Sequence, residues 1–142
     1  MTAPAGPPPA AAARQRQDAY RRGRRAEWLA AWWLRLKGYR VLARGFRCPA
    51  GEIDLVAKRG RILAFVEVKQ RDRMAVAAEA VSHRQRKRIA RAAEAFLQGR
   101  PDLGALILRF DAVLLSRHFW RRGEWPLRHE KDAWRRDTRL PY

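Results

Sequence analysis

The sequence predicts an α/β fold, in which a mixed β-sheet is flanked by helices, from two observations. Helical periodicity appears twice, over residues 14–37 and 82–97. Short β-type runs lie between and after these helices and give the order α-β-β-β-α-β. A helix crossover links the third strand to the fourth, as expected for a single mixed-sheet domain.

The first helix is expected over residues 14–37 and ends before Gly38, a residue that favours helix C-termini. Small residues form one stripe along it and would allow close approach to a sheet: Gly23, Ala26 and Ala30. Large apolar residues form a second stripe and are expected to face the core: Leu29, Trp32, Trp33 and Leu36. Residues 1–13 are rich in Ala and Pro and are expected to form a disordered tail, with residues 14–142 as a single domain.

Three β-type runs follow, at residues 39–44, 52–58 and 62–69, and Arg59-Gly60 is expected to join the last two in a tight hairpin. Ser82 is a suitable N-cap for the second helix. The apolar side of that helix consists of Ile89, Ala92, Ala93, Phe96 and Leu97. A fourth strand is expected at residues 106–115 and a short fifth strand at 125–129.

The charge balance is strongly basic. The chain has 32 Lys and Arg against 14 Asp and Glu, which gives a formal net charge of +18. Such a field concentrates polyanions, so nucleic acid is the first expected partner and an anionic membrane surface the second. The alternative is a host with a GC-rich genome, in which arginine simply replaces lysine and the basic composition indicates no particular partner. The second helix carries the cations assigned to nucleic-acid binding: Arg84, Arg86, Lys87, Arg88 and Arg91.

Several classes of protein are excluded by what the sequence lacks. The single cysteine, Cys48, excludes an intrachain disulfide and a cysteine-based zinc cluster, and it fits a cytoplasmic protein. No apolar run approaches the roughly 18 residues that span a bilayer, and residues 1–13 do not have the pattern of a signal peptide. His83, His118 and His129 lack zinc-ligand spacing and are expected at the surface or near phosphate.

Two acidic residues interrupt otherwise apolar strands: Asp54 in GEIDLV and Glu67 in FVEVK. Alternation places Glu67 and Lys69 on the same face as Leu63 and Phe65. Charges on a strand covered on both sides are destabilising unless they are paired or bound to a metal ion. Because a short hairpin joins the two strands, Asp54 and Glu67 can come close together.

Clustered carboxylates repel one another, and a hard divalent cation resolves that conflict. Mg²⁺, or Mn²⁺ in its place, would be bound by Asp54 and Glu67, with water and a substrate phosphate as further ligands. Lys69 could then orient or deprotonate a water molecule, or stabilise the transition state. The simpler alternative is an ion pair between Glu67 and Lys69 at the end of a sheet.

The runs GEIDLVA and FVEVK, a helix start of the form AV-S-x-R, and the run RFDAV together resemble the YraN-like family. The resemblance covers residues 23–134. It implies the restriction-endonuclease-like, PD-(D/E)xK fold, similar in outline to archaeal Holliday-junction resolvases. It also implies that Asp54, Glu67 and Lys69 are the acids and the lysine of a nuclease motif. Glu27 matches a helical acid that often completes such sites, and it borders the small-residue stripe.

Three positions depart from the family pattern. Ala26 stands where a glycine is usual, Gly45 where many members have asparagine, and Gln85 where the second helix often begins with lysine. Lys87 or Arg84 could supply the charge that Gln85 lacks. Asp111, in the RFD run, is expected to pair with an arginine rather than to bind a metal ion.

The resemblance favours a Mg²⁺-dependent endonuclease that hydrolyses phosphodiester bonds, structure-selective in the manner of a resolvase. DNA is favoured over RNA as its substrate, and a homodimer is one expected assembly. The alternative is a non-catalytic nucleic-acid-binding protein that retains a nuclease scaffold. A third hypothesis is an adaptor whose basic helix docks an acidic partner or a membrane surface.

Overall fold

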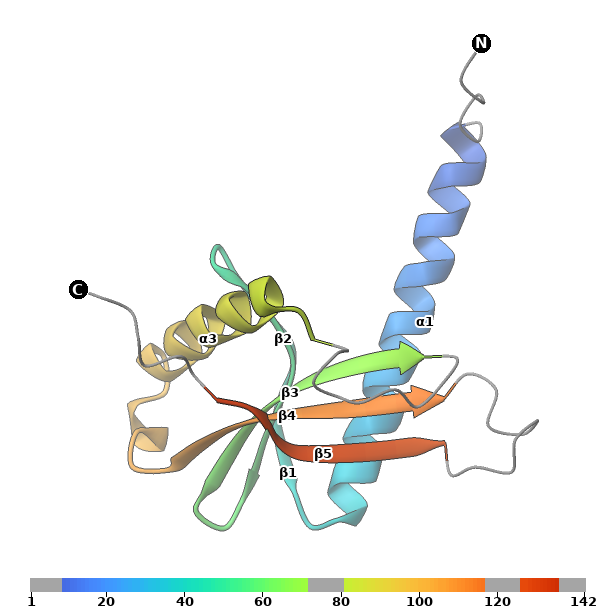
Figure 1. Ribbon diagram of the computed structural model, residues 1–142. Helices are drawn as coiled ribbons and strands as arrows, with labels where there is room; N and C mark the ends of the chain where they lie inside the picture. The colour runs from blue at the N-terminus through green and yellow to red at the C-terminus, as the bar shows by residue number, and fades with distance from the viewer. Residues whose placement is uncertain (1–8, 72–80, 117–125, 136–142) are drawn as a thin grey trace.

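The computed structural model describes residues 9–71, 81–116 and 126–135, and it shows a five-stranded sheet flanked by helices (Figure 1). The elements in chain order are α1 (Pro9–Leu36), β1 (Arg40–Cys48), β2 (Gly51–Arg59), β3 (Ile62–Arg71), α3 (His83–Gln98), a 3-10 turn (Pro101–Leu103), β4 (Ile107–Ser116) and β5 (Leu127–Trp134). The order confirms the predicted α/β fold class.

The strands lie in the sheet in the same order as in the chain, β1-β2-β3-β4-β5. Only the β3–β4 pair among them is parallel, and α3 lies in the crossover that a parallel pair requires. The β2–β3 turn consists of Gly60 and Arg61, because Arg59 pairs with Ile62. The predicted turn at Arg59-Gly60 was therefore misplaced by one residue. Gly60 has a φ of 57°, which glycine adopts without steric conflict.

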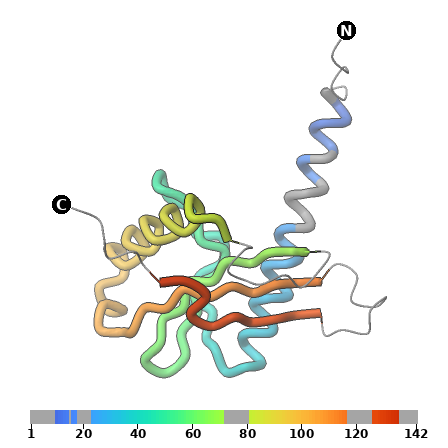
Figure 2. Tube along the Cα trace, viewed as in Figure 1, coloured from blue at the N-terminus to red at the C-terminus, as the bar shows by residue number. Residues whose placement is uncertain are grey.

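Alternation along the strands divides the interior into two apolar layers, one under each helix. Figure 2 shows the paths of the two helices relative to the strands. Leu63 and Phe65 of β3 pack in the layer that contains Ile89 and Phe96 of α3. Ala64 and Val66, the alternate residues, pack in the layer under α1. The predicted alternation of β3 is confirmed, and the central strand is covered on both faces, as its sequence indicated.

The sheet contacts α1 through small residues. Ala26, Ala30 and Ala31 are buried together with Leu34, and the helix begins at Pro9, earlier than the predicted residue 14. The prediction that the large apolar stripe faces the core was wrong: Leu29, Trp32 and Leu36 are exposed, and Trp33 is half-buried. The reason is that Leu55, Val66 and Val113 already fill the layer from the sheet side, so the small stripe fits against them.

Helix α3 agrees closely with its prediction. Ser82 is the N-cap: its Oγ accepts a hydrogen bond from the Gln85 N–H at 3.2 Å, and the Gln85 Oε1 accepts one from the Ser82 N–H at 3.3 Å. This reciprocal capping box satisfies two backbone donors at the helix start. It also gives Gln85, one of the departures from the family pattern, a structural role. The predicted apolar side is buried except for Leu97, which is half-buried.

The remaining strands extend beyond their predicted limits. β1 continues to Cys48 through Gly45, whose φ of 62° lies in the left-handed region that glycine and asparagine tolerate. Gly45 can therefore adopt the same backbone conformation as the asparagine that many family members have at this position. β5 begins at Leu127 and continues to Trp134, well past the predicted residue 129. Within the described ranges, neither helix combines the length and apolar composition that crossing a membrane requires.

Candidate functional site

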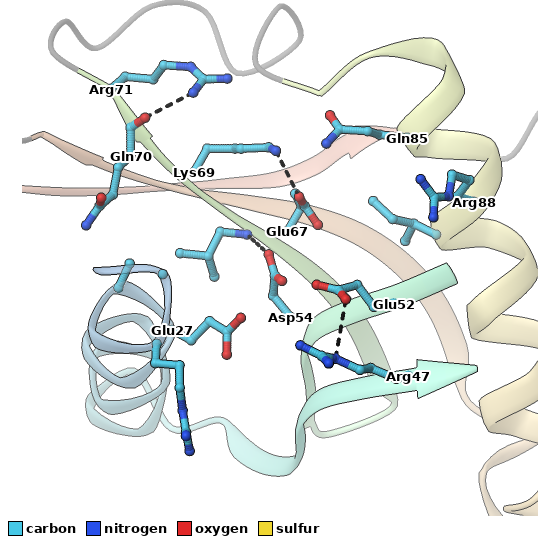
Figure 3. Close-up of a pocket in the computed structure, with 15 residues that line it drawn as sticks. Glu27, Arg47, Glu52, Asp54, Glu67, Lys69, Gln70, Arg71, Gln85 and Arg88 are labelled. Carbon is cyan, nitrogen blue, oxygen red and sulfur yellow. Dashed lines mark hydrogen bonds and ion pairs between the residues drawn. The ribbon is translucent and has the colours of Figure 1, made fainter. Parts of the chain in front are cut away.

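A cleft of about 600 Å³ opens between α1, the start of α3 and the ends of β2 and β3 (Figure 3). Asp54, Glu67 and Lys69 lie in it, together with Glu27 from α1. Basic side chains also line it: Arg24, Arg47, Arg71 and Arg88. The cleft thus gathers the predicted acids and lysine from three separate elements.

The cleft exists because β2 and β3 separate at Asp54. Their pairing ends at Leu55 and Val66, whereas β2 stays paired with β1 as far as Gly51. At the point of separation, the Asp54 side chain replaces the β2 backbone as the acceptor. Its Oδ2 accepts a hydrogen bond from the Val68 N–H at 2.8 Å. Asp54 therefore satisfies a strand donor that would otherwise lack a partner, and it is held in place beside Glu67.

Glu67 and Lys69 lie on one face of β3, as predicted. The Lys69 Nζ is 3.2 Å from the Glu67 Oε1, and the two side chains are 20% and 12% exposed. The ion pair is therefore largely shielded from solvent but open to the cleft (Figure 3). The geometry accommodates both interpretations of the ExK triplet, because the paired lysine is also adjacent to the acids.

The three carboxylates are crowded enough to perturb one another. Burial, followed by the nearby charge of Asp54, raises the pKa of Glu67 to about 8, although Lys69 opposes the rise. Burial and the Asp54 charge likewise raise the pKa of Glu27 to about 7. Burial also raises the pKa of Asp54, despite the hydrogen bond from Val68. Burial is the largest cause at all three acids, and the charge of Asp54 adds to it at Glu27 and Glu67.

This donor set suits a hard divalent cation. No three Asp, Glu, His or Cys side chains within the described ranges are arranged as a ready metal-ligand group. Mg²⁺, however, commonly uses only one or two carboxylates and takes its other ligands from water and phosphate. Asp54 and Glu67 line the same cleft, and the charge of Asp54 raises the pKa of Glu67. They could therefore hold one cation between them, and Glu27 borders the same space.

The position of Arg88 in the cleft depends on a close approach of α3 to β2. A Cβ added to Gly51 would lie 3.0 Å from the Arg88 carbonyl oxygen, so glycine permits this packing. Among the other predicted nucleic-acid-binding residues, Arg84, Lys87 and Arg91 are exposed along α3. Arg86 is half-buried and differs from these: its Nε donates to the Val81 carbonyl at 3.0 Å.

Three arginines of the cleft were missed by the sequence analysis. Arg24 precedes Glu27 by about one helical turn, and Arg71 follows Lys69 by two residues on the same strand, so both carried a detectable signal. Arg47 carried no such sequence signal, because it reaches the cleft through the β1–β2 hairpin. Its Nε lies 3.5 Å from an exposed acid of the same hairpin, Glu52.

A second polar cluster lies under α1, apart from the cleft. The Arg109 Nε and Nη2 donate to the two carboxylate oxygens of Asp111, each at 2.8 Å, which confirms the predicted arginine pairing. The His129 Nε2 lies 2.8 Å from the Asp111 Oδ2. Burial alone would raise the pKa of Asp111, but hydrogen bonds from His129 and Arg109 hold it below its usual value.

His129 corrects a prediction, since its side chain is only 2% exposed and does not lie at the surface. β5 carries it against the buried Asp111, which supplies its polar partner. His83 is exposed, as predicted, and His118 lies outside the described residues.

Comparison with known proteins identifies the family. The model of "Uncharacterised protein family UPF0102" matches residues 26–115, more than half of the chain. The chain is 51% identical over 129 residues to the UPF0102 protein amb4503 of Paramagnetospirillum magneticum, covering 87% of this chain and 95% of that protein. It is 55% identical over 117 residues to a UPF0102 protein of Parvibaculum lavamentivorans, covering 82% and 84% of the two chains. The YraN-like motifs and these similarities agree, and the chain belongs to the UPF0102 family.

Proposed function

We propose that this protein is a metal-dependent nuclease that hydrolyses phosphodiester bonds in nucleic acid, with DNA as the preferred substrate. The observation that carries the proposal is the convergence of Asp54, Glu67 and Lys69 in one cleft lined by arginines. A largely buried group of acids is unfavourable for folding unless a cation balances it. A basic surround attracts a polyanion to that same place.

Each residue of the cleft has a role in this proposal. Asp54 and Glu67 would hold Mg²⁺ or Mn²⁺ through their carboxylate oxygens. When bound, such a cation supplies Lewis-acid polarisation of the phosphate and a lower pKa for the attacking water. Lys69 would donate to a phosphate oxygen or orient that water. Glu27, whose pKa is raised to about 7, can exchange a proton near neutral pH and would assist in proton transfer.

The arginines would hold the substrate by its backbone. Arg24, Arg47 and Arg88 line the cleft from α1, β1 and α3, so they surround the acids. Contacts of this kind position a nucleic acid without reading its sequence. They also make binding depend steeply on salt concentration. The exposed cations of α3 would extend the same surface beyond the cleft.

A cleavage screen tests the proposal. Branched, single-stranded and duplex DNA and matched RNAs would be incubated with the full chain in Mg²⁺, in Mn²⁺ and in EDTA. We expect metal-dependent cleavage that is lost in Glu67→Gln and strongly reduced in Lys69→Met. Glu94→Gln, the same change at an exposed acid of α3, is the matched control and should cleave normally. Cleavage that is equal in wild type and Glu67→Gln would refute the proposal.

A second candidate is a nucleic-acid-binding protein without turnover. The ion pair between Glu67 and Lys69 favours it, because each group already has a partner in the absence of metal. This candidate predicts salt-sensitive binding that Mg²⁺ does not strengthen and that survives Glu67→Gln. Strand cleavage by the wild type, with loss in that variant, would exclude it.

A further inference from the structure

The outward side of α1 is apolar over three turns. Trp28, Trp32 and Leu36 are spaced four residues apart and are 55%, 51% and 61% exposed, and Leu29 beside them is 41% exposed. We call these four residues the outer apolar face of α1. Single exposed apolar residues are common on proteins, but a contiguous group of large ones indicates a surface that contacts something else.

The outer apolar face is directed away from the rest of the fold. Ala26, Ala30 and Leu34 repeat at the same four-residue spacing and are buried against the sheet. Trp32 follows Ala30 by two residues, about 200° around the helix, so the two rows lie on opposite sides of α1. The cleft lies on the sheet side of α1, so whatever contacts the outer face would leave the cleft accessible.

The charged side chains that the structure describes on this side of α1 are positive. Arg25 and Arg35 are exposed and lie on the same side of the helix as the two tryptophans, one before them and one after. Arg14, also exposed, returns to this side about four turns before Trp28. Glu27, by contrast, lies in the cleft. An apolar face bordered by arginines matches a partner that is both apolar and anionic.

A second copy of the chain is a poor occupant. Two antiparallel helices that share this face would bring Arg25 of one copy against Arg35 of the other, and each chain has a net charge of +18. Half-exposed side chains of this size offer on the order of 400 Å², about half of what one partner contributes to a standard interface. Single-stranded nucleic acid could stack on Trp28 and Trp32, but it gains little from the aliphatic Leu29 and Leu36.

We propose that the outer apolar face of α1 docks on an anionic lipid bilayer. Tryptophan is favoured at the boundary between headgroups and acyl chains, where its ring is apolar and its N–H is polar. Leu29 and Leu36 would enter the apolar side of that boundary. Arg25 and Arg35 would bind lipid phosphates while α1 lies along the surface, as in other interfacial helices. This inference is independent of nuclease activity.

Vesicle flotation of the full chain tests the inference. Vesicles of phosphatidylcholine alone and of phosphatidylcholine with phosphatidylglycerol would be compared at about 0.15 M salt, where long-range charge effects are screened. We expect wild type to float only with the anionic vesicles. Trp28→Ala with Trp32→Ala should lower the bound fraction about tenfold or more, since both rings are exposed apolar surface. Ile107→Ala, which removes a similarly exposed side chain from β4, is the control and should float normally.

Four results would overturn the inference. Wild type that stays with the soluble fraction, or a double variant that floats like wild type, would show that the face does not bind lipid. A wild-type dimer that becomes monomeric in the double variant, measured by light scattering, would assign the face to a second copy. Loss of oligothymidylate binding in the double variant with normal flotation would assign it to nucleic acid. Circular dichroism of both variants would verify that each is folded.

Discussion

Replacing Glu67 with glutamine tests whether the cleft carries negative charge that its neighbours leave unbalanced. The change keeps the shape of the side chain and removes its ability to ionise. Burial and the Asp54 charge raise the pKa of Glu67 to about 8. We therefore expect Glu67→Gln to increase the free energy of unfolding in metal-free buffer, although it breaks the ion pair with Lys69.

The sign follows from proton linkage. In the unfolded chain Glu67 loses its proton near its ordinary pKa of 4.5, whereas the folded protein retains that proton up to about 8. The folded state binds more protons between these values, so wild-type stability should fall as pH rises through this window. One pKa unit corresponds to about 1.4 kcal/mol. The full pKa difference of Glu67 between the two states would correspond to several times that. The lost ion pair with Lys69 and the coupled titration of Asp54 reduce the expected gain in stability to about 1–3 kcal/mol at neutral pH.

Urea unfolding in EDTA, measured at several pH values between 5 and 8, provides the assay. The stability advantage of Glu67→Gln should be small at the acid end and should grow with pH. Glu94→Gln, in which an exposed acid is changed, should keep the pH dependence of the wild-type curve. Adding Mn²⁺ should stabilise wild type by binding the folded state, and it should stabilise Glu67→Gln much less.

Two outcomes would refute this reasoning. A Glu67→Gln protein that is less stable than wild type across the whole range would mean that the Lys69 ion pair outweighs the crowding of the acids. A stability difference that stays constant with pH would mean that Glu67 is not the group that titrates. Either result would remove the electrostatic argument for a cation site. Neither result would test whether the arginines that line the cleft bind nucleic acid.

Two further predictions concern the packing that positions the cleft, and a third concerns the separate Asp111 cluster. Ala30→Leu should lower stability by about 1–3 kcal/mol in thermal unfolding, because Ala30 is fully buried against the sheet. Gly51→Ala should weaken nucleic-acid binding in a fluorescence anisotropy titration, because a Cβ there meets the Arg88 carbonyl at 3.0 Å. Asp111→Asn should lower stability by about 3 kcal/mol at neutral pH in urea unfolding, because it leaves Arg109 and His129 without their anion. That loss should shrink in strong acid, below the lowered pKa of Asp111, where wild type loses the same interactions.

The strands and the acids in them could be predicted from sequence because both produce local signals. β-type runs bounded by turn residues located the first three strands, and an acid inside such a run is conspicuous because burying it alone is unfavourable. The failure at α1 has a physical cause as well. Helical periodicity reveals two stripes, small and large, but not which one meets the sheet. That choice depends on how much of the layer the sheet side chains already fill, which the helix sequence does not contain.

Arg47 and His129 show the same limit at longer range. Each reaches its neighbours only through a hairpin or an edge strand, so no spacing along the chain connects Arg47 with the cleft or His129 with Asp111. Register between strands decides these contacts, and a change of one residue would send the side chain to the opposite face. Arg24 and Arg71 differ, because one helical turn or one strand repeat links them to residues already identified.

Asp111 and Glu67 give the same signal in the sequence, an acid inside an apolar strand, and the structure separates them by their neighbours. Two basic side chains and the Asp132 N–H surround Asp111, and they hold its pKa low. Glu67 has the Lys69 amine on one side but the Asp54 carboxylate on the other, and burial followed by the Asp54 charge raises its pKa. A carboxylate whose charge is already balanced gains little from an added cation, whereas a crowded one gains much. Both acids are buried, so the crowding of carboxylates at Asp54 and Glu67 is the reason to look for a metal ion there and not at Asp111.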